Sequence, residues 1–329
     1  MHFNATVARL DVMRTFKSIG AKKLNFYNID IRIPKLRGLL QRICDLLLSL
    51  YYLLRIHPHD KVYFQYPFLS PSLLIIATLF KFKNAEIIYL IHDLESVRYS
   101  DCNSLNKKDL KVLNSADRLL VHTDKMKQLL QNKGVTSIMV PIQLFDYYSD
   151  DSYIEEKVIT TSYSHTIAFA GNLSKSQFLK ELDHSDIPNQ ISFNLYGVKP
   201  DWNITNPQID YQGKFSPEHT AMIHAGWGLV WDGNTINTCS GDLGEYLKII
   251  SPHKLSLYLA AGIPVIVWKQ SAQAELVQNH HLGIVVNTIS EIYPILKSIT
   301  NQEYSCLLRN ARKCGNKLRN GAFLKNKVL

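Results

Sequence analysis

The sequence lacks the paired cysteines of a disulfide framework or a structural zinc site. Its five cysteines are scattered over 329 residues and none forms a C-x-x-C pair, which is typical of a protein of the reducing cytosol. The N-terminal residues carry an aspartate and no apolar h-region, so they do not predict a secretory signal. No Asp-x-Asp pair occurs, so we expect no bound metal ion and no other cofactor.

The chain also has no hydrophobic run that is long enough to span a membrane. The apolar stretch from Leu39 to Leu54 is interrupted by Arg42 and Asp45 and is too short to cross a bilayer. It predicts a buried helix. Its aromatic and basic flanks leave open the alternative of a helix that lies in a membrane interface.

Acidic residues are fewer than basic residues, 28 against 37, so the net charge is +9. Basic residues gather at both ends of the chain: Lys17, Lys22, Lys23, Arg32, Lys35 and Arg37 at one, and Arg309, Arg312, Lys313, Lys317 and Arg319 at the other. This excess favours a polyanionic partner, such as anionic lipid head groups or a diphosphate-bearing substrate. Nucleic acid is not expected, because no RNP-like, zinc-finger or recognition-helix motif accompanies the charge. A solvated basic surface is the plainer alternative.

Strand and helix patterns alternate along the first half of the chain. Residues 61–66 (KVYFQY), 85–91 (AEIIYLI) and 118–122 (RLLVH) are short apolar runs that predict buried parallel strands. Helices are expected over residues 70–82, 107–114 and 124–133. This order predicts one doubly wound α/β unit.

The pattern restarts after a polar stretch at residues 147–164, which we interpret as a linker. Further strands are expected at residues 166–170, 191–196, 227–231 and 263–268. We therefore predict an α/β protein of two Rossmann-like, doubly wound domains that face a cleft. The first covers residues 1–155 and the second residues 156–310, and a basic C-terminal helix at 311–329 has the length to pack back on the first.

The most informative segment is SPHKLSLYLAAGIPVIVW, at residues 251–268. Ser251 is a favourable N-cap and Pro252 suits the first helical position, so the segment predicts a helix that stops at the following glycine. Lys254 then lies in the first turn, where a cation opposes the helix dipole unless an anion is bound. We expect a phosphate there. A solvated lysine is the alternative, and the adjacent His253 suits packing or capping.

Two further predicted strands are followed by loops that suit a nucleotide. In the loop AGNLSKS, Asn172 and Ser174 are placed to contact phosphate or sugar oxygens. The next strand ends at Tyr196 and Gly197, where an aromatic residue beside a glycine can admit a uracil ring. A simple turn explains either loop equally well.

A long glycine-rich loop follows the strand at residues 227–231 and precedes the Lys254 helix. Its Asp232 and Asp242 are candidate acceptors for sugar hydroxyls, with a plain surface loop as the alternative. Glu245 and Lys248, just after this loop, are expected to pair with each other.

The strand at residues 85–91 runs directly into His92 and Asp93. A histidine and an aspartate at the carboxyl end of a strand can act in proton transfer. A structural hydrogen bond is the alternative.

Several segments together are recognisable: IHDLESVR (91–98), IQLFDY (142–147), AFAGNLS (168–174), NLYGV (194–198) and the long block at 228–268 with its WDG, CSG, YLK and PHK motifs. They resemble the bacterial β-1,6-galactofuranosyltransferases of O-antigen assembly, over nearly the whole chain. A more distant similarity extends to the glucosyltransferases that elongate glycans on serine-rich adhesins.

The resemblance implies a GT-B fold and transfer of galactofuranose from UDP-galactofuranose to a lipid-diphosphate-linked oligosaccharide. The first domain would bind the acceptor and the second the nucleotide sugar. UDP contacts are implied at Asn172, Ser174, Tyr196, Gly197, His253 and Lys254, donor-sugar contacts at Asp232 and Asp242, and catalysis at Asp93 with His92. A UDP-glucose or UDP-galactopyranose donor stays open, because such relatives share the phosphate-binding residues.

Leu257 departs from a known pattern. Many retaining GT-B enzymes carry at this position a glutamate that holds the nucleotide ribose, so the leucine favours an inverting mechanism. Asp93 would then take the proton from the acceptor hydroxyl, while Lys254 and its helix N-terminus stabilise the departing UDP.

The expected partners are a UDP-sugar, the lipid-linked acceptor of O-antigen, lipopolysaccharide or capsule synthesis, and the anionic inner face of the cell membrane. The basic termini would hold the cytoplasmic protein there peripherally. A homo-oligomer is also compatible with the sequence. The alternative functions are a non-catalytic nucleotide-sugar-binding subunit and a nucleotide-sugar epimerase.

Overall fold

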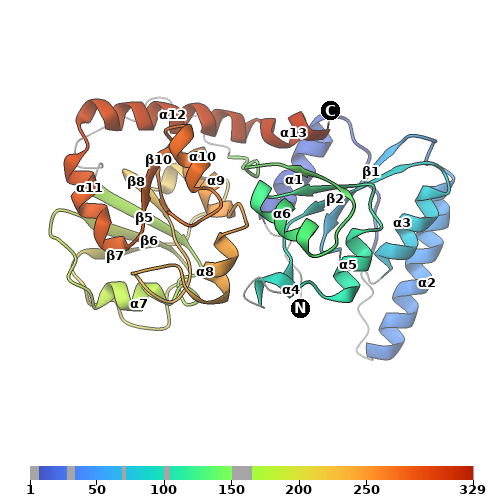
Figure 1. The fold of residues 1–329 in the computed structure, drawn as a ribbon, viewed down its shortest axis with the longest axis horizontal. Coiled ribbons are helices and arrows are strands. Elements are labelled where there is room, and N and C mark those ends of the chain that lie inside the picture. The colour runs from blue at the N-terminus through green and yellow to red at the C-terminus, as the bar shows by residue number, and fades with distance from the viewer. Residues whose placement is uncertain (1–6, 28–33, 69–71, 100–103, 150–164, 329) are drawn as a thin grey trace. The chain divides into compact units, whose positions relative to one another are not determined.

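The structure, a computed structural model, describes residues 7–27, 34–68, 72–99, 104–149 and 165–328. The chain divides into two compact units (Figure 1). Phe16–Ile142 form the N-terminal unit, and Gln143–Leu329 together with Met1–Thr15 form the C-terminal unit. The grouping of the first residues with the C-terminal unit differs from the predicted limits, which placed them in the first domain. The predicted boundary at residue 155 lies outside the described residues.

A parallel sheet of strand order β1-β2-β3-β4 forms the centre of the N-terminal unit. Its strands are β1 (Lys61–Tyr66), β2 (Glu86–Ile91), β3 (Arg118–Val121) and β4 (Ile138–Pro141). Every residue of β2 after Glu86 is buried, as expected for an inner strand that is covered on both faces. The three strands predicted for this half are confirmed, and β4 adds a short edge strand that the pattern did not predict.

One helix of the N-terminal unit, α2, precedes its first strand, and the others connect the strands. The helices are α2 (Pro34–Leu53), α3 (Leu73–Lys81), α4 (Glu95–Arg98), α5 (Lys107–Leu113) and α6 (Asp124–Asn132). Asn106 and Thr123 cap α5 and α6, because each side chain accepts a hydrogen bond from a backbone N–H of the first turn. The helices expected at 107–114 and 124–133 are thereby confirmed. Part of the segment predicted at 70–82 lies outside the described residues.

Helix α2 corrects one prediction, because most of its leucines and its isoleucine are exposed or half-buried. Leu39 and Leu47 are 58% and 62% exposed, and Leu54, just beyond the helix, is 83% exposed. Asp45 and Ser49 are instead fully buried. The apolar run therefore formed a helix, as expected, but the polar side of that helix faces the unit.

The C-terminal unit contains a parallel sheet of strand order β10-β9-β8-β5-β6-β7. Its strands are β5 (Thr166–Gly171), β6 (Ser192–Gly197), β7 (Ile209–Gly213), β8 (Trp227–Val230), β9 (Val265–Trp268) and β10 (Gly283–Val286). The chain adds β6 and β7 on one side of β5 and then β8, β9 and β10 on the other. The order of connection therefore reverses between β5 and β8, and ligands of open α/β sheets bind at such a switch point.

The helices of this unit are α7 (Phe178–Asp183), α8 (Gly241–Leu247), α9 (His253–Ala260), α10 (Ala274–Asn279), α11 (Ile292–Ser298), α12 (Asn301–Arg319) and α13 (Ala322–Val328). Helix α1 (Val7–Ser18) contributes its residues up to Thr15. Helix α12 packs on α9 at Gly315, where a Cβ atom would lie 2.1 Å from the Leu259 carbonyl oxygen. The N-terminus of α13 is held by Asp146, which accepts hydrogen bonds from the backbone of Phe323 and Leu324.

Candidate functional site

The candidate site is the carboxyl edge of the C-terminal sheet at its switch point. Helix α9 begins there, and Gly262, with a φ of +72°, ends it as predicted. One detail differs from the prediction, since Pro252 is the N-cap and the helix starts at His253 rather than at Pro252. Ser251 lies before the cap and is 2% exposed.

Lys254 lies in the first turn of α9 and reaches across the ends of β5 and β8. Its Nζ donates to the Trp231 carbonyl oxygen at 3.1 Å and lies 3.8 Å from Asp232 Oδ2. The same nitrogen lies 4.3 Å from the ring centroid of Phe169 on β5. With 16% of the side chain exposed, this cation is held in place at the switch point and remains accessible.

The loop after β8 brings Asp232 to Lys254. Asp232 Oδ1 accepts from the Gly233 backbone N–H at 3.0 Å, which orients its carboxylate. Gly233 has a φ of +103°, and a Cβ atom there would lie 2.3 Å from the Ser240 carbonyl oxygen, so the turn requires glycine. Asp242 lies farther along, in the first turn of α8. Lys248 binds both carboxylate oxygens of Glu245, at 2.8 and 2.7 Å, which confirms that predicted pair.

The loops after β5 and β6 form the rest of this edge. Asn172 is exposed after β5, and its side chain accepts from the Lys175 backbone at 3.1 Å. Ser174 is half-buried in the same loop. Gly171 and Gly197 face each other at the ends of β5 and β6, and no side chain of these two residues covers the backbone there.

Tyr196 lies one residue before Gly197 and is 3% exposed. Its hydroxyl accepts from the His224 backbone N–H at 2.9 Å, and its ring packs edge-on against Phe215. The ring therefore supports the sheet edge. Its contact with a uracil stays a prediction.

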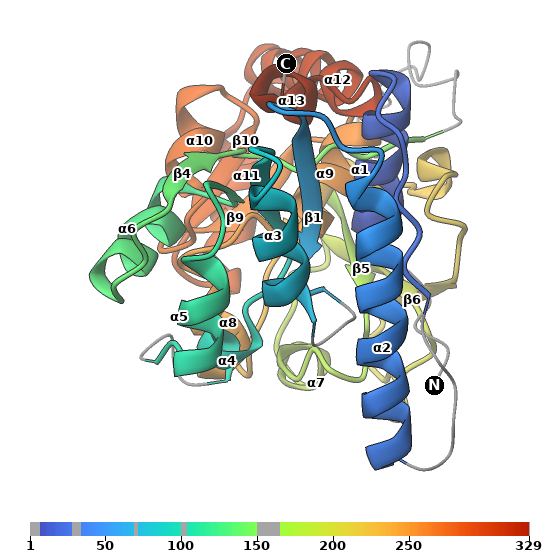
Figure 2. The ribbon, with the colours of Figure 1, turned by 90° about the vertical axis from the view of Figure 1, so that its right-hand side faces the viewer.

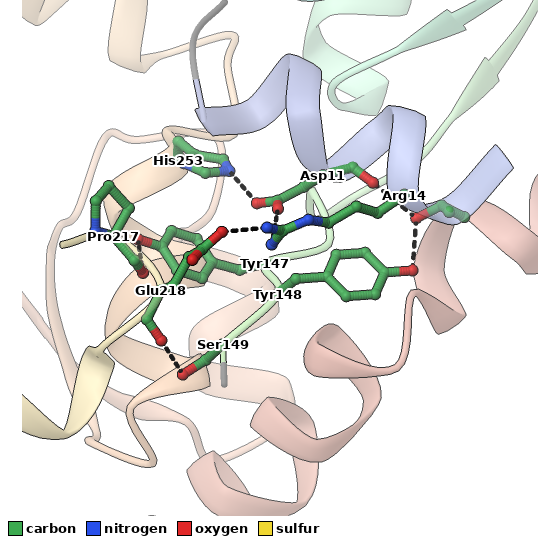
Figure 3. A network of polar contacts seen from close by, with 9 residues as sticks. Asp11, Arg14, Tyr147, Tyr148, Ser149, Pro217, Glu218 and His253 are labelled. Atoms are coloured by element: carbon green, nitrogen blue, oxygen red, sulfur yellow. Dashed lines mark hydrogen bonds and ion pairs between the residues drawn. The ribbon is translucent and has the colours of Figure 1, made fainter. Parts of the chain in front are cut away.

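His253 contacts a residue that the sequence did not indicate as part of a site, Asp11 of α1. Figure 3 shows the two side chains pointing toward each other, with His253 Nε2 3.8 Å from Asp11 Oδ2. Burial lowers the pKa of His253 to about 4, although a hydrogen bond with the Asp146 backbone acts against this shift. Burial also raises the pKa of Asp11 to about 7, against the opposing effect of Arg14. The surroundings therefore disfavour a charge on either group.

A polar network fixes this part of α1 in the C-terminal unit (Figure 3). Arg14 pairs with Glu218 and lies 3.6 Å from Asp11. Thr15 and Tyr148 share a hydrogen bond of 3.1 Å through their hydroxyl groups. Asp11 lies at a helix position with no motif around it, so only the folded chain reveals that it accompanies His253.

The catalytic candidates, His92 and Asp93, lie in the N-terminal unit at the carboxyl end of β2. Asp93 Oδ2 lies 2.6 Å from Arg98 of α4, and its Oδ1 accepts from the Leu94 backbone N–H at 2.9 Å. His92 Nε2 lies 2.7 Å from Gln65 Oε1 of the neighbouring strand. Both side chains are partly exposed and are oriented by these contacts.

Within the described residues, no group of three or more histidine, cysteine, aspartate or glutamate side chains is placed to hold a metal ion. A helix long and apolar enough to cross a membrane is likewise not found in that part of the chain.

Comparison with known proteins identifies a family of two-domain proteins. Residues 2–144 match the N-terminal domain of the glucosyltransferase 3-like family, and residues 167–329 match its C-terminal domain. This chain belongs to the glucosyltransferase 3-like family. It is therefore a glycosyltransferase, and the family identified from the sequence motifs is confirmed.

Two curated relatives cover nearly the whole chain. The β-1,6-galactofuranosyltransferase WbbI of Escherichia coli K12 is 29% identical over 98% of this chain and 92% of its own length. Glucosyltransferase 3 of Streptococcus gordonii is 28% identical over 99% of this chain and 92% of its own length.

Solved structures confirm the fold class as GT-B. Anabaena HepE in complex with UDP matches with a TM-score of 0.55 and 12% identity, over 86% of this chain and 82% of that one. The lipopolysaccharide outer core galactosyltransferase WaaB matches with a TM-score of 0.53 and 13% identity, over 90% and 80% of the two chains.

Proposed function

We propose that this glycosyltransferase moves galactofuranose from UDP-galactofuranose to a lipid-diphosphate-linked oligosaccharide of O-antigen, lipopolysaccharide or capsule synthesis, with inversion at the anomeric carbon. The observation that carries the donor half is Lys254, a cation in the first turn of α9 at the switch point of the sheet. Backbone N–H groups at a helix N-terminus and a lysine beside them suit a diphosphate.

The similarity to WbbI supports galactofuranose, and the UDP bound to HepE supports a uridine nucleotide. Asn172, Ser174, Tyr196, Gly197 and His253 are proposed to contact the UDP, and Asp232 and Asp242 the sugar. Leu257 is 7% exposed and packs in the core of its unit. Its apolar side chain offers no carboxylate to a nucleotide ribose, in keeping with the proposed inversion.

In the proposed reaction, the acceptor hydroxyl oxygen bonds to the anomeric carbon as the bond from that carbon to the UDP oxygen breaks. Asp93 receives the hydroxyl proton, and His92 is the competing base. The negative charge on the departing UDP is met by Lys254 and the α9 N–H groups, without a metal ion. Arg98 would compete with the acceptor hydroxyl for Asp93, so its ion pair has to loosen for proton transfer.

The test is UDP release by the purified full chain from a panel of UDP-sugars, with and without a synthetic lipid-linked acceptor. We expect release only with UDP-galactofuranose and acceptor together, and a product of inverted anomeric configuration. Preference for UDP-glucose or UDP-galactopyranose would replace the donor. UDP binding without turnover for any donor would instead indicate a non-catalytic subunit.

A further inference from the structure

Helix α2 presents apolar side chains outward and polar side chains inward, the reverse of an ordinary surface helix. Gln41, Asp45 and Ser49 lie four residues apart on one face and are 6%, 0% and 0% exposed. The outward side chains, here called the α2 apolar face, are Leu39, Ile43, Leu46, Leu47, Leu50 and Leu54, each at least 44% exposed.

Hydrogen bonds on the inner side fix this orientation. Gln41 donates to Asp45 Oδ1 at 2.9 Å and to the Tyr27 carbonyl oxygen at 2.8 Å. The Tyr52 hydroxyl accepts from the Asn25 backbone N–H at 2.8 Å. Rotation of the helix would break the bonds to Tyr27 and Asn25, so the exposure of the α2 apolar face is built into the unit.

The apolar surface continues beyond α2. Helix α3 packs against α2 (Figure 2). Ile75 of α3 is 51% exposed beside a groove that is also lined by Ile43, Leu46 and Arg42. From Leu39 to Leu50 the face extends about 17 Å at the rise of an α-helix. Continuous apolar surface of this kind on a folded protein marks an interaction site.

Every charged side chain that the described part of α2 exposes is positive. Lys35, Arg37 and Arg42 are exposed, whereas the acidic Asp45 is fully buried. Arg55 follows the helix, with its guanidinium 4.3 Å from the Tyr51 ring centroid. Cations thus lie on the N-terminal half of α2 and directly after its C-terminal end.

This charge decides between two occupants. A second copy that paired through the same face in a two-fold dimer would bring cations of one helix against cations of the other, with no exposed acid on α2 to compensate. An anionic bilayer offers acyl chains to the leucines and head groups to the cations, as for helices that lie in the membrane interface. We propose that the α2 apolar face and its cations bind the surface of an anionic lipid bilayer.

The proposal deepens the lipid-linked acceptor proposed above, because it names the surface that would bring the enzyme to such an acceptor. It also assigns the membrane-binding surface to α2, whereas the sequence had predicted that the basic termini would bind the membrane. Vesicle binding needs neither donor, acceptor nor turnover, so its failure is distinguishable from failure of the proposed reaction.

The experiment is co-sedimentation of the purified full chain with vesicles of phosphatidylglycerol and phosphatidylethanolamine, or of phosphatidylcholine alone. The double variant Leu47→Gln, Leu50→Gln removes part of the face, and Ile138→Gln on β4, where the isoleucine is 66% exposed, is the matched control. We expect the double variant to lower partitioning to anionic vesicles at least about tenfold, given the transfer free energy of two leucines. Ile138→Gln should bind as the original chain does.

A second variant separates the charge contribution. Arg37→Gln with Arg42→Gln should weaken binding to anionic vesicles by about fivefold per cation while leaving the weak binding to phosphatidylcholine unchanged. All altered side chains are exposed, so circular dichroism and melting should match the original chain. Full vesicle binding by Leu47→Gln, Leu50→Gln would overturn the proposal. A dimer that this variant dissociates in sedimentation velocity, with no vesicle binding by the original chain, would assign the face to a second copy.

Discussion

Lys254 is the residue on which the donor site depends. Lys254→Ala removes the cation from the first turn of α9, and we expect UDP affinity to fall by about 1.5–3 kcal/mol, the range of a charge-assisted hydrogen bond. Isothermal titration calorimetry measures this directly. Lys313→Ala, an exposed lysine of α12, is the control and should bind UDP normally. Unchanged UDP affinity in Lys254→Ala would remove this residue from the site.

Asp93 is the proposed general base, and Asp93→Asn preserves its shape while removing its capacity to take a proton. We expect turnover to fall at least about a hundredfold, since a positioned carboxylate contributes about 10²–10⁴-fold to such a step. UDP affinity should stay within about twofold, because the proposed donor site lies in the other unit. Near-normal turnover in Asp93→Asn, with loss in His92→Ala or Asp232→Asn, would place the base elsewhere.

Asp11 and His253 make opposite contributions to the pH dependence of stability. The pKa of Asp11 is raised to about 7, so the folded chain holds a proton that the unfolded chain has lost, and stability falls as pH rises from about 4 to 7. The pKa of His253 is lowered to about 4, so the unfolded chain binds the extra proton, and stability rises with pH between about 4 and 6.5.

The variant Asp11→Asn isolates the first contribution. Relative to the original chain it should gain stability as pH rises from 4.5 to 8, by about 1–4 kcal/mol, because it has no buried carboxylate to ionise. Urea unfolding at the two pH values measures the difference. Asp210→Asn, at an exposed strand position, should show no such trend. A stability difference that is equal at both pH values would mean that Asp11 is not held protonated by its surroundings.

At the scale of single elements, the close approach of β5 and β6 makes glycine necessary at the end of β6. Gly197 has a φ of +151°, and a Cβ atom there would lie 2.1 Å from the Gly171 carbonyl oxygen. We expect Gly197→Ala to destabilise the C-terminal unit by more than about 2 kcal/mol, since neither backbone can yield cheaply. Gly38→Ala in α2 is the matched control, because no atom lies within 4 Å of its Cβ position. This change should stabilise its helix by up to about 1 kcal/mol. Equal melting of the two variants would contradict the packing at Gly197.

Helix α2 shows the limit of prediction for an element. The apolar run that includes Leu39, Ile43 and Leu50 indicated a helix, and a helix formed there. Its burial was predicted wrongly because periodicity reports which residues share a face, but not which face the rest of the unit covers. Gln41 and Asp45 hydrogen-bond to each other inside the unit, so the polar face could be buried at little cost.

For the whole molecule, the proposed neutralisation of UDP without a metal has a direct test. We expect transfer to survive EDTA, because Lys254 and the α9 N–H groups supply the positive charge. Coupled UDP-release assays with and without the chelator measure this. Loss of transfer on chelation, restored by manganese or magnesium, would show that a divalent cation bridges the diphosphate instead.

The sequence by itself determined the fold class, the family and most of the strands. Short apolar runs such as Ile87–Ile91 are typical of buried strands in a parallel sheet, and Gly262 can end a helix with no help from distant residues. The first turn of α9, with Lys254, was therefore visible as a local pattern. These features depend on neighbours along the chain, which the sequence displays directly.

Only the tertiary structure decided the partners that are distant along the chain. Asp11 and His253 lie 3.8 Å apart although 242 positions separate them (253 − 11), and no local pattern links them. Three further features were also decided by contacts between distant segments. They are the assignment of the first residues to the C-terminal unit, the switch point between β5 and β8, and the outward apolar face of α2. Each depends on which surfaces meet when the chain closes on itself, and burial and pairing between distant segments then outweigh local preference.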